Sequence, residues 1–158
     1  MINIAKNVAL ESFSEPDSRE INFDNQAEVD HILRVLPYYF KRFEEFCEGK
    51  AVTLRKNGKI LAIAGLIPTF MGSANLIFFA SKDLQAGFDH HVAKAFWIFI
   101  STATLQYRRI QTTCLADDSK EAIRNRRFLE FFGFEKEGLM KKYGFDGEDV
   151  YMYSIVVD

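Results

Sequence analysis

The sequence is poor in the features that would quickly place a protein in a class. Its 158 residues contain two cysteines, Cys47 and Cys114, which make neither a disulfide framework nor the spacing of a metal site. The formal net charge of −2 argues against a protein whose main work is to neutralise nucleic-acid phosphates. We therefore expect no metal, no disulfide and no principal role in binding nucleic acid.

Long apolar runs are also missing. The most apolar stretch, residues 95–107, is followed directly by Arg108 and Arg109, and it is too short to cross a bilayer as a helix. The first residues lack the basic region and the uninterrupted apolar run of a signal peptide. We therefore expect no membrane span and a cytoplasmic protein.

What the sequence does contain is enough apolar material for a core. Hydrophobic residues make up 48% of the chain, and 16 residues are phenylalanine, which suffices for one stable domain over residues 1–158. No internal repeat, low-complexity tract or linker divides that length.

Hydrophobic periodicity and turn signals predict a series of strands and helices. The expected elements are a strand within residues 1–14, a helix over 24–46 that Asp24 caps and that Pro37 kinks or divides, a hairpin over 51–68, a strand over 74–80, a long buried helix within 81–107, a strand over 109–115, a helix over 118–132, and a strand pair over 134–142 and 150–157. This order predicts an α/β fold with a mixed, mostly antiparallel sheet of about six to seven strands and helices on both faces.

Two of these elements carry explicit end signals. Asn57 and Gly58 supply the positive φ angles of a tight hairpin turn. Asp118 is expected to cap the helix over 118–132, with Glu121 at the reciprocal position of a capping box. Gly133 is expected to end that helix in the left-handed conformation.

One polar residue interrupts the apolar face of this helix. On a period of 3.6 residues, Asn125 falls on the same face as Ala122, Leu129 and Phe132. We therefore expect Asn125 to lie among apolar neighbours. It could serve a functional site there, or it could make a structural hydrogen bond to the sheet.

The strand, the helix over 118–132, the glycine-phenylalanine pair after it and the final two strands resemble the C-terminal half of the GNAT acetyltransferase superfamily. In that family the helix usually reads Asn, a small residue three positions later, Tyr four positions further, and Gly-Phe four positions beyond the Tyr. Aligning on Gly133 places Ala122 at the Asn, Asn125 at the small residue and Leu129 at the Tyr. The resemblance implies a single GNAT-like domain, with two important side chains replaced.

The Arg-Phe-Leu run ahead of Gly133 also resembles the small internal-virion proteins of short-tailed phages, which look like degenerate GNAT domains. This second resemblance implies a phage-encoded protein, located in the host cytoplasm or in the virion, whose partners are phage structural proteins.

The GNAT resemblance implies a site for acetyl-CoA or CoA. The family's loop usually reads Gln or Arg, two residues, Gly, one residue, then Gly or Ala, and its small residues let helix N–H groups reach the pyrophosphate. Here Gln85 comes first, whereas Phe88 and His90 stand at the small positions. The implied cofactor-binding residues are Phe79, Ala80, Ser81, Gln85, Ala86, Gly87, Phe88 and His90.

The charge of this loop is also unusual for a site that binds a diphosphate. Gly87 stands one place before the first expected glycine, and Asp89 adds a negative charge beside the diphosphate position. His90 and His91 could offset that charge when protonated.

Acetyl transfer requires a base that deprotonates the amine and often an acid that protonates the leaving thiolate. Leu129 stands where the family usually has a tyrosine that acts as the general acid, and leucine cannot donate a proton. The candidate catalytic residues are Asn125, Cys114, His90 and Asp83. Each also has a structural interpretation: Cys114 as a small buried hydrophobe, Asp83 as a helix cap and His90 as a first-turn surface residue.

Two hypotheses follow from these residues. The first is a phage-encoded GNAT-like protein whose catalysis is weakened or lost, and which acts as a virion-associated, assembly or ejection accessory module that binds a protein partner. The second is an active acetyl-CoA-dependent N-acetyltransferase, whose partners are acyl-CoA and an unknown amine of a small molecule or a protein.

Overall fold

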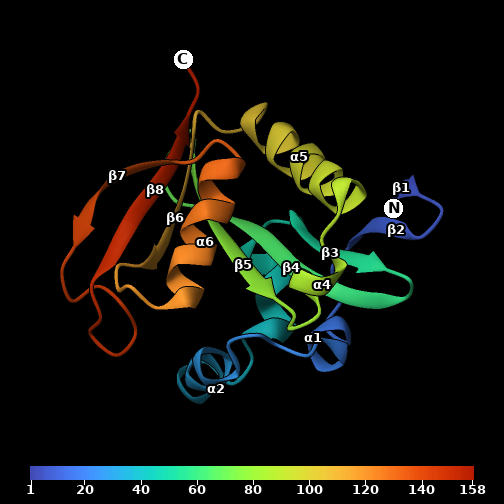
Figure 1. The fold of residues 1–158 in the computed structure, drawn as a ribbon, viewed down its shortest axis with the longest axis horizontal. Helices are drawn as coiled ribbons and strands as arrows, with labels where there is room; N and C mark the ends of the chain where they lie inside the picture. The colour runs from blue at the N-terminus through green and yellow to red at the C-terminus, as the bar shows by residue number, and fades with distance from the viewer. The chain divides into compact units, whose positions relative to one another are not determined.

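The computed structural model describes all residues from 1 to 158, and the chain divides into two compact units. Unit 1 comprises Met1–Pro68 and Leu76–Phe99, and unit 2 comprises Thr69–Asn75 and Ile100–Asp158 (Figure 1). In chain order the elements are β1 (Ile2–Ala5), β2 (Val8–Ser12), α1 (Asp17–Glu20), α2 (Gln26–Val35), η1 (Phe40–Arg42), α3 (Phe43–Phe46), β3 (Ala51–Lys56), β4 (Lys59–Pro68), β5 (Ser73–Ala80), α4 (Leu84–Gly87), α5 (His90–Thr104), β6 (Arg109–Leu115), α6 (Lys120–Phe131), β7 (Glu135–Met140) and β8 (Val150–Val156).

The strands follow the hydrogen-bonded order β1-β2-β3-β4-β5-β6-β8-β7. Strands β5 and β6 pair in parallel, and pairs such as β2 with β3 and β6 with β8 are antiparallel. The predicted α/β fold with a mixed, mostly antiparallel sheet is confirmed. The sheet has eight strands, because the N-terminal segment forms the hairpin β1–β2 where we expected one strand.

The hairpin β3–β4 forms at the predicted turn. Asn57 has φ 51° and Gly58 has φ 78°, and Lys56 pairs with Lys59 across the turn. Positive φ at both central residues is the geometry that matches the right-handed twist of the flanking strands. The prediction from the Asn-Gly pair is confirmed.

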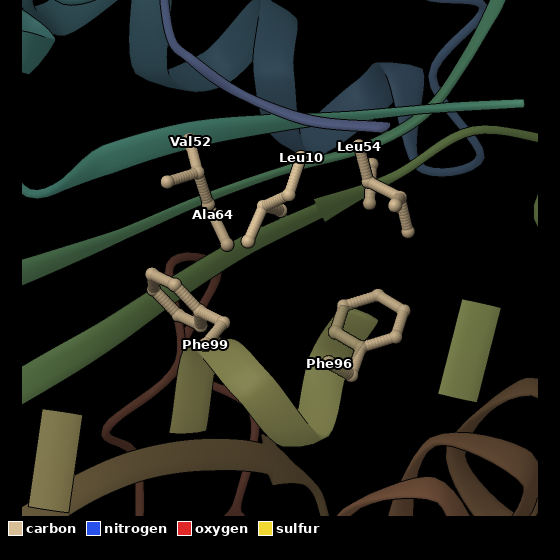
Figure 2. A pocket seen from close by; sticks show the side chains of 7 residues that line it. Leu10, Val52, Leu54, Ala64, Phe96 and Phe99 are labelled. Carbon is tan, nitrogen blue, oxygen red and sulfur yellow. The ribbon is translucent and has the colours of Figure 1, made fainter. Parts of the chain in front are cut away.

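Helices pack on both faces of the unit 1 strands. On one face, aromatic rings of η1 and α3 surround Phe79 of β5, with ring centroids 5.2 Å away for Phe40 and 6.0 Å for Phe43. On the other face, α5 presents Phe96 and Phe99 toward β2, β3 and β4 (Figure 2) and leaves a small apolar cavity of about 10 Å³. Adjacent residues of a strand point to opposite faces, and β4 serves both layers: Ile63 belongs to the core with Phe40 and Phe43, whereas Ala62 and Ala64 line the cavity under α5.

Two of the predicted helices differ in detail from the structure. Asn25, and not Asp24, is the N-cap of α2, and its side chain accepts a hydrogen bond from Glu28 N at 3.3 Å. Helix α2 ends at Val35, before Pro37, and a separate helical segment begins at Phe40. The long helix expected within residues 81–107 is divided into the single turn α4 and the helix α5.

Helix α6 in unit 2 begins one residue later than its predicted cap. Ser119, and not Asp118, is the N-cap, and its Oγ accepts a hydrogen bond from Ala122 N at 3.1 Å. The capping box is absent because Glu121 is then the second residue of the helix. The predicted end is confirmed: Gly133 has φ 86°, and the Phe134 N–H donates to Leu129 O at 3.1 Å.

No helix combines the length and the apolar character that a bilayer crossing requires.

Candidate functional site

The segment that follows β5 is fixed to the neighbouring strand of unit 1. Ser81 is buried, and its N–H donates to Leu61 O at 2.9 Å. Its Oγ accepts a hydrogen bond from the N–H of Asp83 at 3.1 Å. Asp83 occupies the N-cap position of α4, but its side chain makes no capping hydrogen bond.

Helix α4 lies close to β4. A Cβ atom on Gly87 would lie 3.2 Å from Cδ1 of Leu61, which is tighter than an ordinary contact, so the absence of a side chain allows this approach. Gln85, Ala86 and Phe88 are exposed. The glycine of the loop therefore serves packing against Leu61 in this structure.

The N-terminus of α5 is capped by Asp89. Its Oδ1 accepts hydrogen bonds from the N–H groups of His91 and Val92, both at 3.0 Å. These donors belong to the first turn, where a helix has no internal acceptors. A carboxylate is favoured at this position because the helix dipole is positive there.

Lys56 of β3 holds the same carboxylate from the other side. Its Nζ donates to Oδ2 of Asp89 at 2.7 Å and to Gly87 O at 2.8 Å, and the Lys56 side chain is only 16% exposed. The hydrogen bond from Lys56, followed by that from Val92 N, lowers the pKa of Asp89 from 3.8 to about 2. Asp89 is therefore a fixed, charged part of the loop at neutral pH.

His90 and His91 follow this cap. Their ring centroids are 3.7 Å apart, and His90 is exposed. His91 uses its backbone N–H to bind Asp89. The imidazole rings are thus adjacent, while the backbone contributes to the cap.

In unit 2, Cys114 is buried near the end of β6. Its Sγ lies 3.8 Å from Ala122 O of α6, and burial raises the pKa of the thiol to about 11. The thiol is therefore protonated at neutral pH. This environment matches the interpretation of Cys114 as a small buried hydrophobe.

Arg126 is the polar residue of α6 that faces the sheet. It donates from Nη1 to Leu115 O and to Asp117 O, both at 2.7 Å, which fixes α6 to the end of β6. Asn125 is exposed, so the expectation that it lies among apolar neighbours is wrong. The helix is rotated such that Ala122, Arg126 and Leu129 form its inward stripe.

A tyrosine of β8 also reaches α6. The hydroxyl of buried Tyr153 donates to Oε1 of Glu130 at 3.1 Å. Burial, and then the hydrogen bond to Glu130, raises the pKa of Tyr153 to about 12. Tyr153 is thus held protonated by its surroundings.

A chain of hydrogen bonds crosses the other face of the unit 2 strands. Arg109 Nε donates to Gln111 Oε1 at 2.7 Å, and its Nη1 donates to Glu137 Oε1 at 2.8 Å. Gln111 donates to Asn75 at 2.9 Å, and Ser154 donates to Glu137 at 2.7 Å. These polar groups satisfy one another, which is typical of structural networks.

The fold is similar to that of solved acetyltransferases. Ard1 from Thermoplasma volcanium has a TM-score of 0.69 at 13% identity, and the match covers 96% of this chain and 99% of that chain. RimL, a ribosomal alpha-N-protein acetyltransferase, has a TM-score of 0.65 at 16% identity, covering 99% and 98%. An acetyltransferase of the GNAT family from Bacillus anthracis has a TM-score of 0.63 at 16% identity, covering 96% of each chain.

The chain has a GNAT fold. No family model and no curated protein matches the sequence. At these identities the structural similarity shows the fold alone, and any activity has to be argued from the residues of this chain. One of the similar structures is RimL in complex with coenzyme A.

The predicted site residues are divided between the two units. Unit 1 brings together Asp83 and the loop residues from Gln85 to His90. Unit 2 contains Cys114 and Asn125, of which only Cys114 is buried. No cluster of three or more His, Cys, Asp or Glu side chains in the structure is arranged to hold a metal ion.

Two residues at this loop were not predicted in their roles. For Asp89 we considered only the negative charge and did not predict that it caps a helix, although an aspartate directly before an apolar-periodic segment is a recognisable N-cap signal. Lys56 lies 33 residues away from Asp89 in the sequence, and no local pattern indicates that the two meet.

Proposed function

We propose that this chain is a GNAT-fold protein in which acetyl transfer is weakened or lost, and which acts as a binding module for a protein partner. The observation that carries the proposal is the cap of α5. The carboxylate of Asp89 occupies the N–H groups of His91 and Val92, and in the GNAT resemblance donors at the start of this helix would bind the pyrophosphate of CoA.

The loop is a poor fit for CoA for two physical reasons. A diphosphate would have to displace Asp89 from its hydrogen bonds to the helix and to Lys56. If Asp89 stayed in place, its negative charge would repel the phosphates. Charge-assisted hydrogen bonds of this kind are stronger than neutral ones, so the internal carboxylate competes well with the ligand.

The residues available for catalysis point the same way. Leu129 stands where the family usually has its acid, and the pKa of Cys114, about 11, is far from the neutral value that suits proton transfer. Asn125 cannot exchange a proton at neutral pH. His90 and Asp83 remain the candidates for a base.

The alternative is an active acetyl-CoA-dependent N-acetyltransferase that acts on an amine of a small molecule or a protein. It is supported by the fold and by the presence of coenzyme A in one RimL structure. In this alternative, Phe79, Ala80, Ser81 and the loop from Gln85 to His90 would hold the cofactor, and Asp89 would have to move aside.

Thermal unfolding in the presence of CoA or acetyl-CoA separates the two functions. A ligand at about 100 times its dissociation constant stabilises the native state by roughly 2.7 kcal/mol, which raises the melting temperature by several degrees. We expect no rise for the wild type and a rise for Asp89→Gly, which frees the two N–H groups. Asp89→Asn is the matched control, because asparagine removes the charge and still caps the helix.

The outcomes are distinct. A rise for the wild type, together with acetylation of any amine in a panel, would overturn the proposal and establish the alternative. No rise in either protein would show that Asp89 is not what prevents binding. The second sequence resemblance implies a location in the host cytoplasm or in the virion. Binding of protein partners would therefore be tested with the same preparation, beginning with phage structural proteins.

A further inference from the structure

One end of unit 2 is built from three segments that lie far apart in the sequence. They are the turn before β5, the connection from α5 to β6 and the residues at the end of β8 (Figure 1). Backbone hydrogen bonds join them. The N–H of Arg109 donates to Gly72 O at 3.0 Å, and the N–H of Val157 donates to Arg108 O at 2.7 Å. The side chains of the three segments therefore share one end of the sheet.

The apolar side chains at this end are exposed to an unusual degree. Phe70 is 85% exposed, Leu105 is 88% exposed and Met71 is fully exposed. Val156 and Val157 are also exposed. We call these five residues the apolar end of unit 2. A large side chain covers roughly 150 to 250 Å², so the first three alone expose on the order of 500 Å².

This area is large for a monomer and close to what a dimer requires. Contiguous apolar patches on soluble monomers rarely exceed about 300 to 600 Å². With its two valines, the apolar end reaches the top of that range and approaches the roughly 800 Å² that each partner buries in an interface of standard size. Because contact of this much apolar surface with water is unfavourable, we expect a protein surface to cover it.

The apolar end is also almost without charge. Its three segments contain only two charged side chains, Arg108 and Asp158, which are of opposite sign. Depletion of charged residues is the compositional signal of an interface core, and homodimer interfaces are more apolar than transient ones. No net charge opposes the approach of a second identical surface, so the composition favours a second copy of this chain over a transient partner.

We propose that the apolar end of unit 2 is the interface of a homodimer. The two copies are related by a two-fold axis, so that the same residues of each copy pack against those of the other and the assembly closes at two chains. This inference goes beyond the proposed function, because a dimer is compatible both with a binding module and with an active transferase.

Sedimentation equilibrium of the intact protein tests the inference. We expect a species of twice the 18.2 kDa chain mass. Its dissociation constant should be about 10 µM or lower, within the range of interfaces of this size. The mass should not rise beyond that of the dimer as the concentration increases, because a two-fold interface uses the surface of both copies.

Two variants from different segments locate the interface. Phe70→Asp and Leu105→Asp each place a carboxylate in the interface twice, and burial of an unpaired charge is unfavourable. Each should raise the dissociation constant roughly 100-fold or more. Tyr38→Asp is the matched control, since Tyr38 is a large side chain that is 69% exposed in unit 1, and it should dimerise as the wild type does. Unchanged far-ultraviolet circular dichroism would show that the variants remain folded.

Several results would overturn the inference. A wild type that stays monomeric up to about 100 µM would show that the apolar end does not self-associate with useful affinity. A dimer that both variants leave intact, or that Tyr38→Asp weakens equally, would place the interface elsewhere. A monomer that binds lipid vesicles, and that loses this binding in Phe70→Asp, would assign the surface to membranes. None of these results depends on CoA, so the proposed function is tested separately.

Discussion

Lys56 on β3 and Asp89 at the start of α5 form an ion pair of 2.7 Å. The pair joins the hairpin β3–β4 to the N-terminus of α5, where Oδ1 of the same carboxylate accepts hydrogen bonds from the N–H groups of His91 and Val92. Because the anion is part of the chain, the helix start is satisfied without a ligand.

This pair predicts a specific dependence of stability on pH. The folded pKa of Asp89, about 2, lies below its ordinary value of 3.8, so its contribution is complete above the ordinary value and disappears as the pH falls toward 2. Chemical denaturation of the wild type and Asp89→Asn between pH 7 and 2 should show a wild-type advantage that shrinks below about pH 4. An advantage that is constant over this range would contradict the assignment.

The buried carboxylate of Asp17 should be important for stability. It is 5% exposed, it accepts hydrogen bonds from Thr53 Oγ1 at 2.6 Å and Ser14 N at 2.9 Å, and it pairs with Arg55 at 2.7 Å. Asp17→Ala leaves the buried hydroxyl of Thr53 and the half-buried guanidinium of Arg55 without this partner, and it should lower the free energy of unfolding by about 2 to 3 kcal/mol in urea denaturation.

Glu20 provides the control for that experiment. It pairs with the same arginine at 2.9 Å, but its side chain is 56% exposed. Glu20→Ala should therefore cost less than about 1 kcal/mol. Equal losses for the Asp17 and Glu20 variants would show that burial does not set the strength of this network.

Gly65 on β4 should not tolerate a side chain. A Cβ atom there would lie 2.8 Å from Cζ of Phe43 and even closer to Sγ of Cys47, and both of these residues are fully buried. Gly65→Ala should lower the free energy of unfolding by about 1 to 3 kcal/mol. Cys47→Ala should recover part of that loss in the double variant, because it removes the nearer atom.

Gly138 on β7 is the matched control for overpacking. A Cβ atom on it would meet nothing within 4 Å. Gly138→Ala should change the free energy of unfolding by less than about 0.5 kcal/mol. A large loss at Gly138, or none at Gly65, would contradict the packing seen here.

Both cysteines should react slowly with thiol reagents in the native protein. Burial raises the pKa of Cys47 to about 12 and that of Cys114 to about 11, and only the thiolate is an effective nucleophile. Labelling with a chromogenic disulfide at pH 8 should be slow until the chain is unfolded with guanidinium. Fast labelling of Cys114 would instead indicate the solvent channel that an active transferase requires.

The elements that could be predicted are those whose signals are local. Asn57 and Gly58 define the hairpin turn, and Gly133 defines the end of α6, because glycine, which has no Cβ, and asparagine both adopt the positive φ that these positions require. Hydrophobic periodicity predicted the strand β6 with its observed bounds. These signals depend on residues within a few positions of one another, and the sequence alone therefore determined the class of fold.

The candidate site depends on contacts between residues that are far apart in the sequence, which no local pattern predicts. The rotation of α6 brought Arg126 toward the sheet and left Asn125 exposed, and the Lys56–Asp89 pair joins residues 33 positions apart. The strand pairing that brings β3 beside β4, and the packing of α4 against Leu61, placed that lysine at the start of α5. Only the tertiary structure could decide this, because the partners of a charged group are set by which elements pack together and not by the residues next to it in the chain.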